Sequence, residues 1–161
     1  MATVRDILKH KDTTVATIGR THTVLEAARA MNDRRIGAVV VTEHGVVVGI
    51  FTERDILTRV VAEQRDPSTT LVEEVMTAPV CYCDPDATLE DCRQVITTRR
   101  IRHLPVAVSG RLVGIVTSGD ILAHEAFERE HTLTSLFEYI HGPAVHAVTA
   151  SVPPASAPRE P

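Results

Sequence analysis

The chain has 161 residues, a formal net charge of −4 and 43% hydrophobic residues, which is typical of a globular protein with one domain or two small ones. The slightly negative charge argues against a surface that binds nucleic acid by electrostatics. An aromatic content of only 3% argues against a stacking platform for single strands.

Cysteine usage and hydropathy predict a cytoplasmic protein. The three cysteines, Cys81, Cys83 and Cys92, are an odd number, which is not typical of a secreted disulfide framework. The N-terminal residues have no apolar signal segment. Apolar runs such as residues 38–42 are far shorter than the ~20 residues of a membrane span. We therefore expect no membrane partner and no nucleic-acid partner.

The beginning of the chain predicts a short helix, a strand and a longer helix. Residues 4–8 are amphipathic enough for one or two helical turns, and residues 15–18 form a short apolar run before a glycine. Residues 23–35 predict a helix that Thr23 and Glu26 would begin as a capping box. Its apolar residues recur at the spacing of one helical face: Val24, Ala27, Ala28 and Met31.

Two apolar strands and a second helix follow. Residues 38–42 and 46–51 are rich in β-branched side chains, and the short connection between them contains Gly45, so they predict a β-hairpin. Residues 52–63 predict a helix, and residues 64–70 predict a linker. The helix is expected to present one apolar face, formed by Ile56, Leu57, Val60 and Val61.

The second half of the chain repeats the first half, sixty-five residues later. It predicts strands at 80–83, 103–108 and 111–116, and helices at 88–100 and from Thr117 past Glu130. From Thr23 to Leu57 the halves align without a gap, and thirteen of the thirty-five pairs are identical. Such an internal repeat indicates two copies of one β-α-β-β-α unit, each too small to be stable alone. We expect the two apolar sheets to pack face to face.

The C-terminal part differs from the repeats. Residues 132–140 predict one more helix, and the last residues, rich in proline, alanine and serine, predict a disordered tail. The expected segments are a first repeat at 1–66, a second repeat at 67–130, a C-terminal helix at 131–142 and a tail at 143–161.

The most distinctive repeated pattern is Gly-x-x-Thr-x-x-Asp, at the junction of a strand and a helix. It contains Thr52 and Asp55 in the first copy, here called the first corner, and Thr117 and Asp120 in the second copy, the second corner. A threonine followed three residues later by an acid fits a helix N-cap, so capping alone would explain both pairs. A helix N-terminus also attracts phosphate, and an ionised aspartate can accept hydrogen bonds from both hydroxyls of a ribose. The two corners are therefore candidate nucleotide sites.

The duplicated pattern, together with Arg99-Arg100-Ile101-Arg102-His103-Leu104-Pro105-Val106 at the start of a strand, resembles a tandem pair of cystathionine-beta-synthase (CBS) domains, or Bateman module, over about residues 1–130. The resemblance implies an α/β fold in which the two repeats pack with pseudo-twofold symmetry around a cleft with up to two nucleotide sites. It implies an adenosine ligand such as AMP, ADP, ATP, NAD or S-adenosylmethionine, and a homodimer. The small stand-alone bacterial members that the chain resembles are mostly sensors or have no assigned role.

By this resemblance, Asp55 and Asp120 would hold ribose hydroxyls, Thr52 and Thr117 would hold phosphate or ribose, and main-chain groups of residues 15–18 and 80–83 would face the adenine. The candidate nucleotide-binding residues are Val15, Thr17, Ile18, Gly37, Ala38, Thr52, Arg54, Asp55, Val80, Cys81, Arg102, His103, Leu104, Pro105, Thr117, Ser118 and Asp120.

The two copies differ beside the corners. Arg102-His103 in the second copy stands where the first copy has Gly37-Ala38, and Arg54 lies beside the first corner alone. Arginine presents a fork of donors that suits phosphate, so we expect the two sites to differ in affinity or ligand. Four other arginines are interpreted as solvated helix ends, where cations offset the helix dipole: Arg34, Arg35, Arg99 and Arg100.

The sequence contains no recognisable catalytic motif, so we expect a regulatory module that signals to an unknown protein partner, without enzymatic activity or a catalytic cofactor. Two alternatives stay open. One is a structural or interaction dimer whose working surface is the helix at 132–140. The other is a thiol or metal redox sensor that uses Cys81 and Cys83, which alternation would place on one side of a strand. Free thiols packed as small apolar groups are the simpler interpretation.

Overall fold

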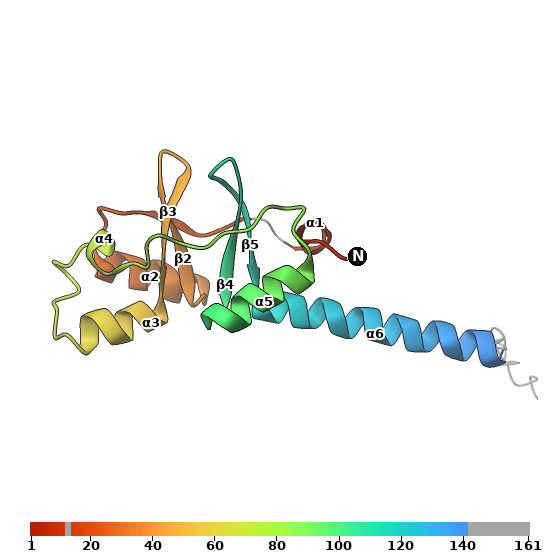
Figure 1. Ribbon diagram of the computed structural model, residues 1–161. Helices are drawn as coiled ribbons and strands as arrows, with labels where there is room; N and C mark the ends of the chain where they lie inside the picture. Colours follow the sequence, from red (N-terminus) through yellow and green to blue (C-terminus); the bar gives the residue numbers. More distant parts are fainter. Residues whose placement is uncertain (12–13, 142–161) are drawn as a thin grey trace, which may run out of the picture. The chain divides into compact units, whose positions relative to one another are not determined.

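The computed structural model describes residues 1–11 and 14–141 (Figure 1). The first repeat contains α1 (Val4–Lys9), β1 (Thr17–Gly19), α2 (Val24–Arg34), β2 (Ala38–Glu43), β3 (Val46–Thr52), α3 (Glu53–Asp55) and η1 (Ile56–Val61). The second repeat contains α4 (Val72–Val75), α5 (Leu89–Arg99), β4 (His103–Val108), β5 (Arg111–Thr117) and α6 (Ser118–His141). The α/β fold predicted from the sequence is confirmed, and Met1–Glu125 form one compact unit.

The strands form one five-stranded sheet in the order β1-β2-β3-β5-β4. The hairpins β2–β3 and β4–β5 are antiparallel, and each has an irregularity at the equivalent place, after Val41 and after Val106. In Figure 1 the two hairpins stand side by side, and they are joined where Val46 of β3 pairs with Arg111 of β5. The sheets therefore meet edge to edge, where the sequence predicted face-to-face packing.

The first helix of each repeat, α1 or α4, is here called its leading helix, and it packs into the core of the other repeat. The first core contains Val72 and Val75 of α4 among residues of the first repeat, which are Ile18, Val24, Ala27, Met31, Val39, Val41, Phe51 and Val60. The second core contains Val4 and Ile7 of α1 among Leu89, Cys92, Ile96, Leu104, Val106, Val116 and Ile121. Because each core includes a helix from the other repeat, neither repeat is complete by itself.

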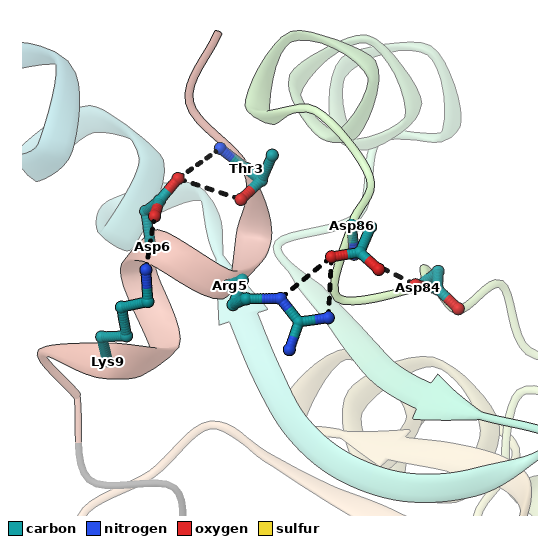
Figure 2. A network of polar contacts seen from close by, with 6 residues as sticks. All are labelled: Thr3, Arg5, Asp6, Lys9, Asp84 and Asp86. Atoms are coloured by element: carbon teal, nitrogen blue, oxygen red, sulfur yellow. Dashed lines mark hydrogen bonds and ion pairs between the residues drawn. The ribbon is translucent and has the colours of Figure 1, made fainter.

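Polar contacts hold α1 against the second repeat (Figure 2). The guanidinium of Arg5 donates to Asp86 Oδ1 at 2.9 and 2.7 Å, and the backbone N–H of Val4 donates to the carbonyl of Ala87 at 3.0 Å. Asp6 caps the start of α1 by accepting from the backbone N–H and the hydroxyl of Thr3, both at 2.9 Å. The cap sets the start of the helix, and the Arg5 pair fixes it to the neighbouring repeat.

The prediction of a strand at 80–83 is wrong. Of these residues, only Cys83 forms a parallel bridge, to Val106. This pair is equivalent to Ile18 and Val41 in the first repeat. In the first repeat the backbone N–H of Val40 donates to the carbonyl of Ala16 at 3.0 Å. The residue equivalent to Val40 in β4 is Pro105, which has no N–H to donate. One proline therefore removes the bond that extends the strand in the first repeat.

The predicted helix at 52–63 is present with a different geometry. After the single turn of α3, η1 is a π-helix, in which Ala62 N donates to the carbonyl of Leu57. Such wide turns break the usual helical spacing. Val60 is 2% exposed, whereas Leu57 is 64% and Val61 is 60% exposed. The prediction of one apolar face is therefore wrong for Leu57 and Val61.

The C-terminal helix predicted at 132–140 is the end of α6, which begins at Ser118 and is continuous to His141. Its side chains Leu133, Leu136 and Ile140 are exposed. The predicted tail at 143–161 lies outside the described residues. Within the described part of the chain, none of the helices combines the length and apolar character that a membrane span requires.

Candidate functional site

At the first corner, the carboxylate of Asp55 is buried and held in one orientation. Asp55 is 5% exposed, and its Oδ2 accepts from the backbone N–H of Thr52 at 2.9 Å and from the Thr52 hydroxyl at 3.0 Å. Its Oδ1 accepts from the hydroxyl of Thr77 at 3.0 Å, and Arg59 lies 3.5 Å away. The capping role considered for this pair is therefore confirmed.

At the second corner, the carboxylate of Asp120 is paired with a cation. Its Oδ2 accepts from the backbone N–H and the hydroxyl of Thr117 at 2.7 and 2.8 Å, and from Lys11 Nζ at 2.5 Å. Burial acts to raise the pKa of Asp120, but the hydrogen bonds from Lys11 and Thr117 outweigh it, so the pKa lies below its ordinary value. Asp120 therefore stays ionised near neutral pH.

Each corner receives one donor from the segment that follows the leading helix of the opposite repeat. That donor is the neutral hydroxyl of Thr77 at the first corner and the ammonium of Lys11 at the second. Sequence reasoning missed both residues. The gap-free alignment of the repeats starts only at Thr23, and the likeness between residues 4–8 and 72–76 ends before Lys11 and Thr77.

Two cavities lie beside the corners. The smaller cavity, of about 360 Å³, is lined by Gly37, Ile50, Thr52, Glu53, Arg54, Asp55, Leu57, Thr77, Arg100, Ile101, Arg102 and His103. The larger cavity, of about 760 Å³, is lined by Ala28, Met31, Asn32, Arg35, Ile36, Gly37, Glu53, Ile56, Arg102, His103, Thr117, Ser118 and Gly119. Each cavity thus combines one corner with the residues that precede β2 or β4 in the other repeat.

The same backbone bond positions both corners. The N–H of Glu53 donates to the carbonyl of Gly37 at 3.1 Å, and the N–H of Ser118 donates to the carbonyl of Arg102 at 3.0 Å. Arg54 adds a contact between the repeats, because its guanidinium donates to the carbonyl of Arg100 at 2.9 Å. These bonds fix the corners relative to the starts of β2 and β4.

The cavities carry more positive than negative side chains. Arg35 and Arg100, both interpreted from the sequence as solvated helix ends, are left-handed C-caps of α2 and α5, and each lines one cavity. Burial, together with the positive charges of Lys11 and Arg102, lowers the pKa of His103, so this imidazole is neutral at neutral pH. The arrangement favours an anionic ligand.

Of the sequence-predicted residues, the structure brings Gly37, Thr52, Arg54, Asp55, Arg102, His103, Thr117 and Ser118 to the cavities. The others lie elsewhere. Ile18 and Leu104 belong to the two cores, and Ala38 and Pro105 are buried in their strands. Val15, Val80 and Cys81 are partly buried, Thr17 is exposed, and Asp120 is covered by Lys11.

The three cysteines are free thiols, which agrees with the simpler interpretation. Cys83 is hydrogen-bonded to Cys92, and this bond together with burial raises the pKa of the Cys83 thiol. Cys81 and Cys83 are only partly buried beside the second core, to which Cys92 belongs. Across residues 1–11 and 14–141, no three His, Cys, Asp or Glu side chains gather as metal ligands.

Two equivalent repeats, exchanged leading helices and paired cavities beside duplicated Thr–Asp corners define an internally duplicated α/β module. The family model of the CBS domain matches residues 4–62 and 72–126, and the chain belongs to this family as a tandem CBS-domain pair. Such pairs are regulatory modules. The CBS domain-containing protein YhcV of Bacillus subtilis is 38% identical over 125 residues, which cover 78% of this chain and 86% of YhcV.

Solved structures have the same architecture. The CBS-domain containing protein ATU1752 from Agrobacterium tumefaciens has a TM-score of 0.72 at 38% identity, covering 77% of this chain and 99% of that one. The CBS domain pair of protein MJ0100, in complex with 5′-methylthioadenosine and S-adenosyl-L-methionine, has a TM-score of 0.70 at 28% identity, covering 80% and 98%. Hypoxic Response Protein I, with two coordinated zinc ions, has a TM-score of 0.68 at 33% identity, covering 77% and 99%.

Proposed function

We propose that this chain is a non-catalytic sensor that binds an adenine nucleotide, of the AMP, ADP, ATP or NAD type, and signals to a protein partner in the cytoplasm. The observation that carries this proposal is the composition of the smaller cavity. Its lining combines two acidic residues, Asp55 and Glu53, with three arginines, Arg54, Arg100 and Arg102. A carboxylate and several guanidinium groups in one cavity suit a molecule with both a diol and a phosphate.

The remaining lining of the smaller cavity suits a purine base. Ile50, Leu57 and Ile101 supply apolar surface beside the polar groups. A volume of about 360 Å³ lies within the usual range for small-molecule pockets. The adenine preference is supported by the MJ0100 pair, whose two ligands both contain adenosine.

A binding role fits the lining better than a catalytic role. His103, the candidate base among the lining residues, is neutral but lies between positive charges that disfavour its protonation. The lining hydroxyl of Thr52 donates to Asp55, which also caps α3. We therefore expect a bound nucleotide to dissociate without having been chemically altered.

We also propose that the sensor is a homodimer. Leu57 and Leu122 occupy equivalent positions of the two repeats, and they are 64% and 67% exposed. Two equivalent apolar side chains within one pseudo-symmetric unit suit a twofold contact with a second copy. Ligand-dependent changes at this contact would carry the signal.

A thermal-shift screen of adenine and guanine nucleotides tests the ligand proposal. A ligand present at a hundred times its dissociation constant stabilises the native state by roughly 2.7 kcal/mol. We expect adenine nucleotides to raise the unfolding temperature, with weaker effects in Asp55→Ala and Asp120→Ala variants that are still folded. Absence of a shift with every nucleotide, followed by absence of heat in calorimetry, would refute the proposal.

A further inference from the structure

Lys11 makes the second corner chemically different from the first. Its Nζ donates to Asp120 Oδ2 at 2.5 Å and to the carbonyl of Ile115 at 3.3 Å. At the first corner, the corresponding donor to Asp55 is the uncharged hydroxyl of Thr77, and the nearest cation, Arg59, lies 3.5 Å from Asp55 Oδ1. Lys11 therefore donates a direct hydrogen bond to the carboxylate of the second corner, whereas Arg59 stands farther from the carboxylate of the first.

This difference changes which groups face each cavity. Asp55 and Thr77 both line the smaller cavity. The larger cavity is lined from the second corner by Thr117, Ser118 and Gly119, but neither Asp120 nor Lys11 is part of its lining. A ribose that enters the larger cavity would thus meet a second corner in which Asp120 is already hydrogen-bonded to Lys11.

Lys11 and Arg102 both act on His103, together with the opposite charges of Glu53 and Asp120. The side chains of Lys11 and Asp120 are 30% and 21% exposed, so the pair is partly shielded from water. Lys11 lies close enough to His103 for its charge to lower the pKa of that imidazole, and Arg102 acts in the same direction. If Lys11 left Asp120 without finding another anion, its ammonium would stay partly desolvated near His103, which is unfavourable.

We propose that Lys11 makes the second corner selective for phosphorylated nucleotides over uncharged nucleosides. This inference rests on the proposed nucleotide-binding function. A ribose diol reaches Asp120 Oδ2 only when Lys11 releases it. A phosphate in the larger cavity gives the flexible lysine a new anionic partner, shared with Arg102. An uncharged nucleoside supplies no such partner, so its binding leaves the ammonium unpaired.

A merely structural role for the ion pair gives a different expectation. If Lys11 only fastens the segment after α1 to α6, its replacement lowers the stability of the protein and affects both kinds of ligand equally. The ratio of two affinities therefore separates the roles, because a uniform loss of folded protein or of rigidity cancels in it.

The experiment uses the full chain carrying Asp55→Asn, which weakens the first corner while an amide oxygen still accepts from Thr52 or Thr77. Calorimetry measures the binding of AMP and of adenosine to this protein, and to the same protein with Lys11→Met or Lys11→Arg. We expect the preference for AMP over adenosine to fall by about tenfold or more with Lys11→Met, and to persist with Lys11→Arg. Thermal unfolding of each variant verifies that it is folded.

The outcomes are distinguishable. A preference that changes by less than about twofold with Lys11→Met overturns the inference. The inference is also overturned if the unmutated chain binds AMP but the Asp55→Asn chain binds neither ligand, with or without Lys11→Met; the proposed function then survives through the first corner. If the unmutated chain binds no adenine nucleotide at all, the proposed function fails, and this inference fails with it.

Discussion

Gly49 of β3 lies directly against the thioether of Met76, a residue of the opposite repeat. A Cβ on Gly49 would come within 2.6 Å of Met76 Sδ and 3.2 Å of the carbonyl oxygen of Thr77. Gly114, the equivalent glycine, lies against Leu8 in the same way, with a Cβ-to-methyl distance of 2.7 Å. The glycine of the repeated pattern therefore leaves room for a side chain at the C-terminal end of the first helix of the other repeat.

Gly49→Ala should lower the free energy of unfolding by about 1–3 kcal/mol, because the added methyl group overpacks this contact. Urea denaturation measures the change. The matched control is Gly119→Ala, where the nearest atom to the new Cβ is Thr117 Oγ1 at an ordinary 3.6 Å, so this change should be neutral or slightly stabilising. Met76→Ala should relieve part of the Gly49→Ala loss, and equal losses in the two glycine variants would contradict the steric explanation.

Thr77→Val should lower the free energy of unfolding by about 1 kcal/mol, since it removes the donor to the buried Oδ1 of Asp55 while keeping the side-chain shape. Thr17→Val, at an exposed position, provides the matched control and should stay within about 0.5 kcal/mol. Urea unfolding of both variants gives the comparison. A loss no greater than that of the control would mean that the Thr77 bond adds nothing.

Asp120 should contribute to the acid sensitivity of the protein. Its folded pKa is lowered below the ordinary 3.8, so its contribution is fully present above that value and is lost as the pH falls through the lowered pKa. The unfolding free energy of the unmutated chain should therefore fall more steeply than that of Asp120→Asn between about pH 5 and about pH 2. Asp6, whose pKa is lowered to about 2, gives the same slope in both proteins. If the unfolding free energies of the two proteins fell in parallel with pH, Asp120 would not be a source of the acid sensitivity.

Cys83 should react slowly in the folded protein, because the hydrogen bond that its S–H donates to Cys92, together with burial, raises the pKa of its thiol and leaves little thiolate. Alkylation by iodoacetamide at neutral pH, followed by peptide mass analysis, should be at least about tenfold slower than in urea. Cys92→Ala should accelerate it. Rapid formation of a Cys83–Cys92 disulfide under mild oxidation would instead favour the redox alternative.

Leu57→Glu and Leu122→Glu should each dissociate the proposed homodimer, since a buried charge replaces an apolar contact. Sedimentation velocity measures the change in mass. Leu136→Glu, on the C-terminal part of α6, is the control and should leave the dimer intact. Dissociation by Leu136→Glu alone would favour the interaction surface at 132–140, and a monomeric unmutated chain would refute the dimer.

Much of the fold follows from local patterns. The hairpins β2–β3 and β4–β5, the capped helix α2 and the duplicated unit were predicted closely, because β-branched runs, capping residues and turn glycines act over short stretches of chain. Predictions failed where a contact from elsewhere decided the outcome. Pro105 removed the strand at 80–83, and Leu57 is exposed like its equivalent Leu122 in α6, because neither side chain is covered by the rest of the chain.

By itself, the sequence determined that this protein is a duplicated α/β pair with two Thr–Asp corners, since a repeated pattern is visible without coordinates. The tertiary structure decided what each corner touches. Lys11 and Asp120 are 109 residues apart, and they meet because each leading helix crosses to the other repeat. No local pattern encodes that crossing: it follows from burying α1 and α4 in opposite cores, and it makes two similar corners chemically unequal.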